Sequence, residues 1–228
     1  MSKPIKSKLP PILWPRLPIL GGPLKWFWWA PGARGKVLRY LTGRYEPEQV
    51  KFFEDHIEPG NVVFDVGANL GYFTLLFSKL AGETGRVFAF EPAVDVARCL
   101  ETHIACNKRT NVIIHRVALS DREGSARFAG GGGTGTGRLA NDGGVEVELT
   151  TIDTVARAQG VSPDFIKIDV EGAGAEVLHG ATEILENNRP VVYLSLHSAH
   201  ERDRSTELLS SFGYTARRDG DGEMVFVP

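Results

Sequence analysis

The sequence predicts an α/β fold: a Rossmann-like, doubly wound and mostly parallel sheet of seven strands. From residue 48 onward, short apolar segments with strand character alternate with longer segments of helical periodicity, which is the pattern of βαβ units. The chain has 228 residues, of which 42% are hydrophobic, enough to bury the core of one such domain. We therefore divide it into an N-terminal arm, residues 1–45, and a domain, residues 46–228.

The first half of the domain has the order βαβαβ. It is preceded by a helix over 48–57, in which Val50, Phe53 and Ile57 share one face. The elements that follow are strand 62–66, helix 72–81, strand 86–91, helix 94–107 and strand 111–119. Because helices join consecutive strands, we expect the strands to run parallel, with helices on both faces of the sheet.

Residues 120–150 interrupt this alternation. Segments 124–130 and 145–152 both alternate as strands, and eight glycines lie in residues 130–144. We predict an inserted antiparallel pair with a flexible glycine-rich loop. The later elements are a helix from Asp153, strand 165–170, helix 175–188, strand 191–197, helix 204–212 and strands 214–218 and 223–228. The DGDG sequence between the last two strands predicts an antiparallel hairpin, which a mostly parallel sheet accommodates at its edge.

The arm differs from the domain in charge and aromatic content. Residues 1–45 hold nine Lys or Arg and no acid, which leaves 17 basic and 28 acidic residues to the remainder. The arm contains all four tryptophans, Trp14, Trp26, Trp28 and Trp29. Its repeated prolines exclude a continuous helix of about 20 residues and therefore a membrane span, and the interrupted apolar run argues against a secretory signal. No recognised base-reading module accompanies the basic residues, so we expect no nucleic-acid partner.

Two interpretations of the arm remain open. Tryptophans beside Lys and Arg suit a membrane interface with anionic lipids, or an acidic partner. Alternatively, the arm packs its aromatic side chains against its own domain, which would hide them from water.

Cys99 and Cys106 lie about 10 Å apart along a predicted helix, too far for a disulfide. Reduced thiols predict a cytoplasmic protein, peripheral at the membrane if the arm binds lipid.

The turn after strand 62–66 is the first candidate binding site. A dinucleotide fingerprint requires glycine at three places, to bring the backbone against a pyrophosphate. Gly67 occupies the first place, but Asn69 and Tyr72 occupy the other two. This mismatch argues against a nicotinamide-dependent oxidoreductase.

The remaining pattern suits a ligand with an amino-acid end and a ribose end. Gly67 permits a close backbone approach, and the free amides of the helix that begins after Gly71 favour a carboxylate. Asp65 suits an ammonium group, directly or through water, and Glu91 at the end of the next strand suits two ribose hydroxyls. Taken together, these groups describe S-adenosyl-L-methionine. As alternatives, Asp65 only caps the turn and Glu91 is a solvated loop acid.

Several segments, in this order and spacing, resemble the FkbM-type methyltransferases, which belong to the class I fold that uses S-adenosylmethionine. They are GRYEP, VVFDVGANLGYFT, VFAFEP, NVIIHRVALSD, LTTID, FIKIDVEG and VLHGA. The resemblance implies a cofactor pocket formed by Asp65, Gly67, Asn69, Gly71 and Glu91. It further implies that Ser120 and Asp121 lie near the adenine. The implied chemistry is O-methylation of a hydroxyl on a glycan, glycolipid or secondary metabolite.

The candidate catalytic residues are Asp169, Glu171 and His197, at the ends of two later strands. Methyl transfer depends first on positioning and then on a base that takes the hydroxyl proton, and we leave open which of the three is the base. Lys167 shares a strand face with Asp169, so an ion pair that only stabilises the edge is the alternative. The three residues could hold Mg²⁺ or Mn²⁺, but no motif has metal spacing, and we expect no metal.

Two departures from the family pattern and one flanking segment bear on the acceptor. The family commonly has an acid at the position of Gly174 and Glu at the position of Ser195. Their loss is compatible with a changed acceptor, or with a catalytically silent module that still binds S-adenosylmethionine. Tyr45 and Glu46 precede the cofactor unit and are candidate substrate contacts, or alternatively only the entry to a helix.

Overall fold

The computed structural model describes residues 15–30, 36–129, 138–140, 144–219 and 223–228. Its main sheet has seven strands in the order β12 (Thr215–Asp219), β13 (Glu223–Val227), β11 (Val191–Ser195), β10 (Phe165–Ile168), β3 (Val62–Val66), β4 (Arg86–Phe90) and β5 (Val112–His115). Every neighbouring pair is parallel except those formed by β13. The predicted sheet and its antiparallel C-terminal hairpin are therefore confirmed.

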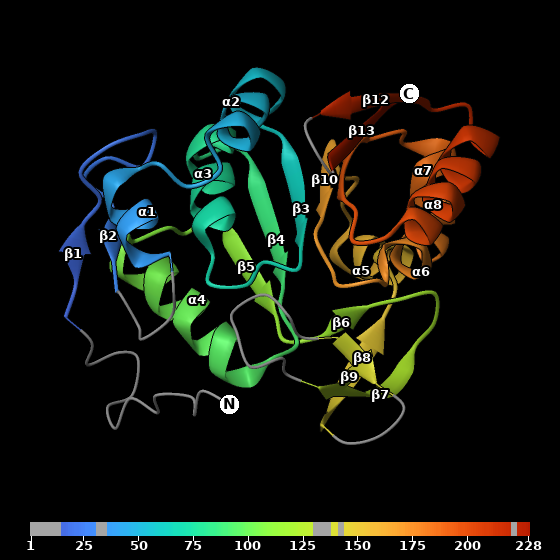
Figure 1. Ribbon diagram of the computed structural model, residues 1–228, viewed down its shortest axis with the longest axis horizontal. Helices are drawn as coiled ribbons and strands as arrows, with labels where there is room; N and C mark the ends of the chain where they lie inside the picture. Colours follow the sequence, from blue (N-terminus) through green and yellow to red (C-terminus); the bar gives the residue numbers. More distant parts are fainter. Residues whose placement is uncertain (1–14, 31–35, 130–137, 141–143, 220–222) are drawn as a thin grey trace.

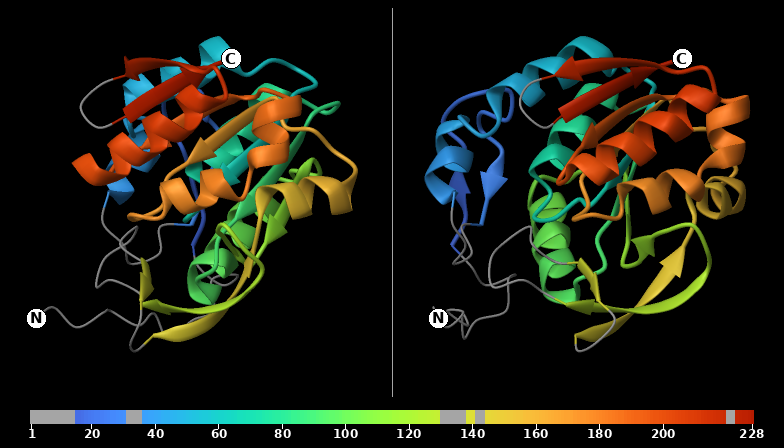
Figure 2. Two further views of the ribbon diagram at one scale, coloured as in Figure 1. Left: turned by 90° about the vertical axis from the view of Figure 1, so that its right-hand side faces the viewer. Right: turned by 45° about the vertical axis from the view of Figure 1, so that its right-hand side comes forward.

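Helices cover both faces of this sheet (Figures 1 and 2). One face carries α2 (Pro47–His56), α3 (Tyr72–Ala81) and α4 (Val94–Cys106), and the other carries α5 (Ile152–Gln159), α6 (Gly174–His179), α7 (Thr182–Asn187) and α8 (Ala199–Ser211). Neighbouring residues of one strand enter opposite cores, as Val63 and Phe64 do in β3. This period of two explains why the central strands read as continuous apolar runs.

The insertion is larger than the predicted pair. Its strands β7 (Gly124–Ala129) and β9 (Val145–Thr150) are antiparallel, as expected, but they belong to a four-stranded sheet in the order β6-β9-β7-β8. The added strands are β6 (Ala118–Leu119) and β8 (Arg138–Ala140). The predicted strand 111–119 was wrong as one element, because its two ends pair in different sheets as β5 and β6. The glycine-rich stretch 130–137 lies outside the described residues.

The predicted helix 175–188 is also two elements, α6 and α7, separated at Gly180. A Cβ atom on Gly180 would lie 2.0 Å from the carbonyl oxygen of Ser120, so the backbone here packs directly against the end of β6. The strand predicted over 165–170 ends at Ile168, so Asp169 follows the strand rather than lying within it. Cys99 and Cys106 of α4 are thiols, as predicted.

The arm packs on the domain with part of its aromatic content. It forms the short strands β1 (Leu17–Pro18) and β2 (Trp28–Trp29), followed by α1 (Val37–Thr42). Trp29 is 1% exposed and stacks on His103 of α4 at 3.8 Å between ring centres, whereas Trp26 is 66% exposed and Trp28 is 45% exposed. The packing interpretation therefore holds for Trp29 and not for those two, and Trp14 lies outside the described residues. No helix among the described residues is long and apolar enough to cross a membrane. The boundary at residue 45 stays a prediction.

Candidate active site

The turn between β3 and α3 lies against the ends of two neighbouring strands. Gly67 has a φ of +76°, and a Cβ atom there would lie 2.1 Å from the carbonyl oxygen of Asp169, just beyond β10. The amides of Gly67 and Ala68 both donate to the carbonyl of Phe90 in β4, at 3.1 and 3.0 Å. Only glycine permits this close approach in a left-handed conformation, so the residue type follows from the packing.

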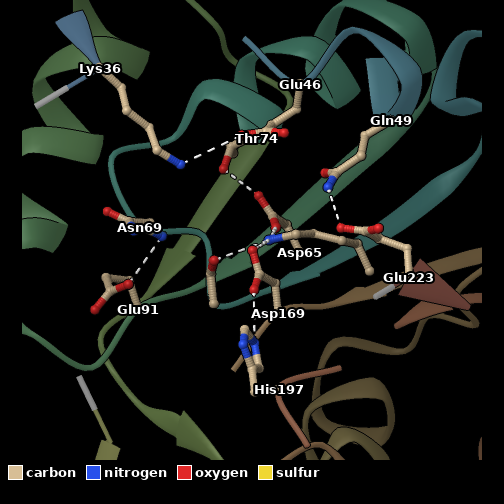
Figure 3. A network of polar contacts seen from close by, with 12 residues as sticks. Lys36, Glu46, Gln49, Asp65, Asn69, Thr74, Glu91, Asp169, His197 and Glu223 are labelled. Carbon is tan, nitrogen blue, oxygen red and sulfur yellow. Dashed lines mark hydrogen bonds and ion pairs between the residues drawn. The ribbon is translucent and has the colours of Figure 1, made fainter. Parts of the chain in front are cut away.

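Glu91 directly follows β4 and its buried side chain faces this turn (Figure 3). Its two carboxylate oxygens accept hydrogen bonds from the backbone amides of Asn69 at 3.0 Å and Ala93 at 2.9 Å. Burial raises the pKa of Glu91, although both amides act to lower it. The buried side-chain oxygen of Asn69 has no hydrogen-bond partner among the described residues. A fixed carboxylate and an open acceptor beside a glycine turn fit a polar ligand that carries hydroxyl and ammonium donors.

Asp65 is more enclosed than the sequence suggested. Its side chain is 0% exposed, lies 3.2 Å from the amine of Lys167, and accepts a hydrogen bond from the Thr74 hydroxyl at 2.6 Å. Lys167 and Thr74 therefore surround a carboxylate that the sequence pattern assigned to a ligand ammonium, although its Oδ1 atom has no hydrogen-bond partner among the described residues.

Lys167 is the centre of this buried network, and sequence reasoning gave it a smaller role. Its amine lies 3.2 Å from Asp65, 3.5 Å from Asp169 and 3.1 Å from the carbonyl oxygen of Gly67, and its side chain is 2% exposed. Burial alone would lower the pKa of Lys167. The two carboxylates, Asp65 and Asp169, raise this pKa by a larger amount, so the net shift is upward. The ion pair weighed as an alternative role for Asp169 is therefore present, and Asp65 takes part in it.

Asp169, Glu171 and His197 form a second polar group at the same edge of the sheet. The Nε2 atom of His197 lies 3.4 Å from Asp169 (Figure 3). The Nδ1 atom of His197 lies 3.7 Å from Glu171. All three side chains are partly exposed, that of Asp169 to 40%. The structure thus brings the three predicted catalytic residues together at a position that solvent and ligand can reach.

The charges of this group are coupled to Lys167. Burial raises the pKa of Asp169, but Lys167 and then His197 lower it, to about 2. The hydrogen bond to Asp169 raises the pKa of His197 above its ordinary value of 6.5, against the opposing effect of burial. Asp169 is therefore a firmly ionised carboxylate, and it stabilises the protonated form of the His197 ring.

Glu201 fixes the backbone that carries His197, a role that the sequence pattern did not reveal. Its buried carboxylate accepts hydrogen bonds from the backbone amides of Gly174 at 2.9 Å and His197 at 3.0 Å. The available signal was the sequence SAHE at the start of α8, in which the Ser198 hydroxyl accepts from the amide of Glu201 at 3.1 Å. That pattern reads as a capping box, whose acid normally returns to the cap residue. Here the acid extends to the loop that carries His197 and to the start of α6.

Residues 65–217 match the Methyltransferase FkbM domain, which includes most of the domain just described. The chain belongs to the FkbM methyltransferase family. S-adenosylmethionine is the cofactor of this methyl transfer, and the predicted methyltransferase with a Rossmann-like fold is confirmed.

Three curated proteins are similar to this FkbM-family chain. Hexuronic acid methyltransferase AglP of Haloferax volcanii is 29% identical over 77% of this chain and 72% of its own length. The 31-O-demethyl-FK506 methyltransferase FkbM of Streptomyces tacrolimicus is 40% identical, over 32% of this chain and 27% of its own length. The 2-O-methyltransferase NoeI of Sinorhizobium fredii is 28% identical over 58% of this chain and 62% of its own length.

Solved structures share the fold. Methyltransferase FkbM of Methylobacillus flagellatus superposes with a TM-score of 0.58 at 16% identity, over 83% of this chain and 52% of that chain. An O-methyltransferase of Thermotoga maritima gives a TM-score of 0.52 at 12% identity, over 79% of this chain and 64% of that chain. The chain therefore spans about half of the solved FkbM protein.

The other predicted site residues, Tyr45, Glu46, Ser120 and Asp121, lie in different parts of the structure. Tyr45 lies in an aromatic cluster with Tyr40, Tyr72 and Phe73, at ring-centre distances of 4.5, 5.0 and 5.6 Å. Burial raises the pKa of Tyr45, and the charge of Asp169 adds to this effect, so Tyr45 lies within electrostatic reach of Asp169. Glu46 instead pairs with Lys36 at 3.5 Å.

Ser120 and Asp121 follow β6, at the junction of the two sheets. The Ser120 hydroxyl donates to Asp121 at 3.1 Å, and Arg122 pairs with Asp121 at 2.9 Å. Ser120 is buried. None of these contacts joins the network around Glu91, so their place near an adenine stays a prediction.

The two departures from the FkbM pattern have carboxylates nearby. A Cβ atom on Gly174 would lie 2.8 Å from a carboxylate oxygen of Glu201, so a neighbouring helix supplies an acid there. Ser195 of β11 lies opposite Glu223 of β13, which accepts a hydrogen bond from Gln49 at 3.0 Å. Among the described residues, no set of three His, Cys, Asp or Glu side chains is arranged to hold a metal ion.

Proposed function

We propose that this protein transfers the methyl group of S-adenosylmethionine to a hydroxyl oxygen of a glycan, glycolipid or secondary metabolite. The observation that carries the proposal is the pairing of His197 with the ionised Asp169, beside a turn and a fixed Glu91 that suit the cofactor. The relatives support oxygen as the acceptor atom, because two of their names specify O-methyl positions and the third specifies hexuronic acid.

The residues around the turn are suited to bind the cofactor at both ends. We assign the ribose hydroxyls to Glu91, whose carboxylate two backbone amides hold in place. The amino-acid end is assigned to the backbone of residues 67–71 and to the open side-chain oxygen of Asn69. Ser120 and Asp121 are assigned to the adenine side. When bound, the cofactor supplies a sulfonium methyl group that is open to in-line displacement.

His197 is the residue that we assign as general base. A base works best when its pKa lies near the working pH, and a carboxylate with a pKa of about 2 holds a proton too weakly. His197 holds a proton more firmly than Asp169 does, and the neighbouring Asp169 raises the pKa of His197 above its ordinary value. Bound S-adenosylmethionine would supply the methyl group to the acceptor oxygen and would leave as S-adenosylhomocysteine, while His197 would take the hydroxyl proton. Asp169 would then stabilise the resulting imidazolium ion.

We also assign a role to each of the two ring nitrogens of His197. Nε2 faces Asp169 at 3.4 Å, whereas Nδ1 lies 3.7 Å from Glu171, beyond hydrogen-bond distance. Nδ1 is therefore the nitrogen that we assign to receive the acceptor proton. Glu171 lies beside it and is placed to accept a hydrogen bond from a second acceptor hydroxyl.

Aromatic residues on the arm side are suited to an acceptor with a ring face. Tyr45 and Tyr72 pack edge to face at 5.0 Å, and the buried Tyr72 hydroxyl has no hydrogen-bond partner among the described residues. A sugar ring offers apolar C–H faces to such side chains and hydroxyls to their polar ends. We assign Tyr45 to this wall of the acceptor site and Glu46 to its solvent edge.

The alternative is a silent module that binds S-adenosylmethionine without transferring its methyl group. It was suggested by Gly174 and Ser195, where the family commonly has acids. The carboxylates of Glu201 and Glu223 beside these positions weaken that argument.

Isothermal titration with S-adenosylmethionine and S-adenosylhomocysteine tests the cofactor site. Micromolar binding by the intact protein is expected, with loss in Glu91→Ala and no loss in Glu83→Gln, which changes an exposed acid elsewhere. Absence of binding by the intact protein would contradict the proposal. Binding without transfer to any hydroxyl of a sugar and polyketide panel, by intact protein and His197→Gln alike, would favour the silent module.

A further inference from the structure

Exposed apolar side chains concentrate on the arm. Seven large hydrophobic side chains are exposed among the described residues, and five of them lie in residues 17–38. The five are Leu17, Leu20, Trp26, Trp28 and Leu38. Isolated exposed hydrophobic residues need no explanation, but five in one short segment define a surface.

The arm strands show why part of this segment faces outward together. β1 and β2 pair antiparallel with Pro18 opposite Trp28, and the pairing continues through Ile19, whose amide donates to Phe27 at 2.8 Å. Side chains alternate between the two faces of such a ribbon. Trp29 is buried against the domain, so its neighbour Trp28 lies on the outer face. Leu20 and Trp26 lie beyond the two paired strands, where they are 60% and 66% exposed. We call these three side chains, together with Lys25 on the same hairpin, the arm surface.

The charged side chains of the arm itself, residues 1–45, have one sign. Arg16, Lys25, Lys36, Arg39 and Arg44 are the exposed basic neighbours of the arm surface, and residues 1–45 contain no acid. Within the described part of the chain, only Lys36 of these five forms an ion pair with a carboxylate. The amine of Lys25 lies 5.2 Å from the ring centre of Trp26, so a cation and an indole are presented together.

We propose that the arm surface docks on an anionic lipid leaflet. Tryptophan prefers the membrane–water interface, where its ring is buried among headgroups and its N–H stays hydrated. Basic residues near an anionic leaflet contribute attraction, and the apolar side chains contribute buried area. The arm surface offers both without a carboxylate that the leaflet would repel.

The observations favour a lipid leaflet over the other partners with which such a surface could be compatible. A nucleic acid would be bound mainly through phosphate contacts and would gain little from exposed Leu20 and Leu38. A symmetric contact between the arm surfaces of two copies would bring nine further basic residues against the same face, because the arm carries no acid. Electrostatic repulsion opposes that contact.

The arm is held in a fixed position relative to the active site (Figure 1). The side chain of Asn107 bonds to both the amide and the carbonyl of Trp28, at 2.7 and 2.8 Å. The ring of His103 contacts the carbonyl oxygens of Ala30 at 3.2 Å and Leu70 at 2.7 Å. Leu70 lies in the candidate cofactor turn, so one buried ring joins the arm to that turn.

A docked arm would therefore orient the site relative to the leaflet. Trp29, Tyr40 and Tyr45 form a continuous aromatic path from the arm to the proposed acceptor wall, with ring-centre distances of 4.8 and 4.5 Å. This placement suits an acceptor hydroxyl on a lipid-linked glycan or glycolipid. That last step rests on the proposed function, whereas docking itself does not.

Vesicle binding tests the docking proposal, with the full chain and no cofactor. Because the arm contains all four tryptophans, their fluorescence reports on the arm alone. We expect a blue shift of emission and co-sedimentation with vesicles of phosphatidylcholine and phosphatidylglycerol, and weak binding to phosphatidylcholine alone. Trp26→Ser with Trp28→Ser should lower the partition coefficient by about tenfold or more. Lys25→Glu with Arg39→Glu should lower it to a similar degree, by about tenfold.

Matched variants complete the design. Val94→Ser with Val145→Ser removes two exposed hydrophobic side chains elsewhere, and Arg86→Glu with Arg202→Glu reverses two exposed charges elsewhere. Both pairs should bind vesicles as the intact protein does. Equal binding to neutral and anionic vesicles, equal losses in the matched variants, or self-association that depends on Trp26 and Trp28 would each overturn the proposal. Binding to single-stranded RNA in preference to anionic vesicles would overturn it as well.

Discussion

Two polar groups lie side by side at the edge of the sheet, and they differ mainly in burial. Lys167 and Asp65 are 2% and 0% exposed, whereas Asp169 and His197 are 40% and 31% exposed. Lys167 contacts both groups, because it lies 3.2 Å from Asp65 and 3.5 Å from Asp169. The buried pair fixes the backbone of the turn, and the partly exposed pair remains able to exchange a proton with a ligand. The comparison indicates that similar ion pairs serve packing or chemistry according to their access to ligand.

The largest expected effect concerns the buried pair. Lys167→Met leaves Asp65 charged and enclosed, and loss of one partner of a buried pair typically costs about 3–5 kcal/mol. Urea denaturation should therefore show a fall of that size in the free energy of unfolding. Adding Asp65→Asn should restore part of it, because the unpaired charge is then absent. An unchanged stability of Lys167→Met would show that the pair does not hold the turn.

The second effect concerns the exposed pair. His197→Gln should lower the rate of methyl transfer by about 10²–10⁴-fold, the usual contribution of a general base. Titration calorimetry should find cofactor affinity unchanged, because His197 has no contact with the turn or Glu91 among the interactions described above. His179→Gln, on α6, is the matched control and should retain the rate. A rate for His197→Gln within about twofold of the intact protein would remove His197 from the mechanism.

A third, smaller effect distinguishes a residue that positions His197, namely Glu201, from His197 itself, which takes the proton. Glu201→Gln can accept one of the two amide hydrogen bonds and turns an N–H₂ group toward the other. An unsatisfied buried donor costs about 1–3 kcal/mol, which thermal unfolding should detect. The rate should fall and the acidic limb of the pH profile should move slightly to lower pH, because Glu201 contacts the His197 backbone at 3.0 Å and its charge is the smallest of the effects that raise the pKa of His197. Glu207→Gln, on an exposed position of the same helix, should change neither quantity.

The smallest expected effect is a displacement of the pH profile. The base must be neutral, so the rate falls as pH drops through the pKa of His197, which Asp169 raises above 6.5. Asp169→Asn removes that carboxylate, and the acidic limb should therefore move to lower pH. A profile measured from mildly acidic to mildly alkaline pH checks the direction. A limb that stays in place would show that Asp169 does not set the pKa of His197.

The sequence supported the fold well because its signals are local. The spacing of apolar residues identified the strands and helices. Gly67 indicated the tight turn after β3, because the left-handed backbone conformation there favours glycine. The strand end at Glu91 was also predictable, since the acid comes directly after an apolar run. The division of 111–119 between two sheets was not predictable, because residues near 116 and 117 change partner without a break in composition.

The candidate site was predicted in part, and the remainder depends on tertiary packing. The register of β10 on β3 places Lys167 directly beside Asp65, and no local pattern reveals that register. Glu201 reaches the loop before its own helix, so its capping-box sequence concealed its second contact. The same limit applied to the arm, whose packing buries Trp29 and leaves Trp26 and Trp28 outside.

The most direct test of the account is an NMR titration of the His197 ring in the intact protein and in Asp169→Asn. We predict a pKa above 6.5 for His197 in the intact protein and a lower value in the variant. His103 and His115 serve as internal references, because burial lowers the pKa of both. A His197 ring that titrates at or below its ordinary value in both proteins would contradict the assignment of the Asp169–His197 pair as the reactive centre.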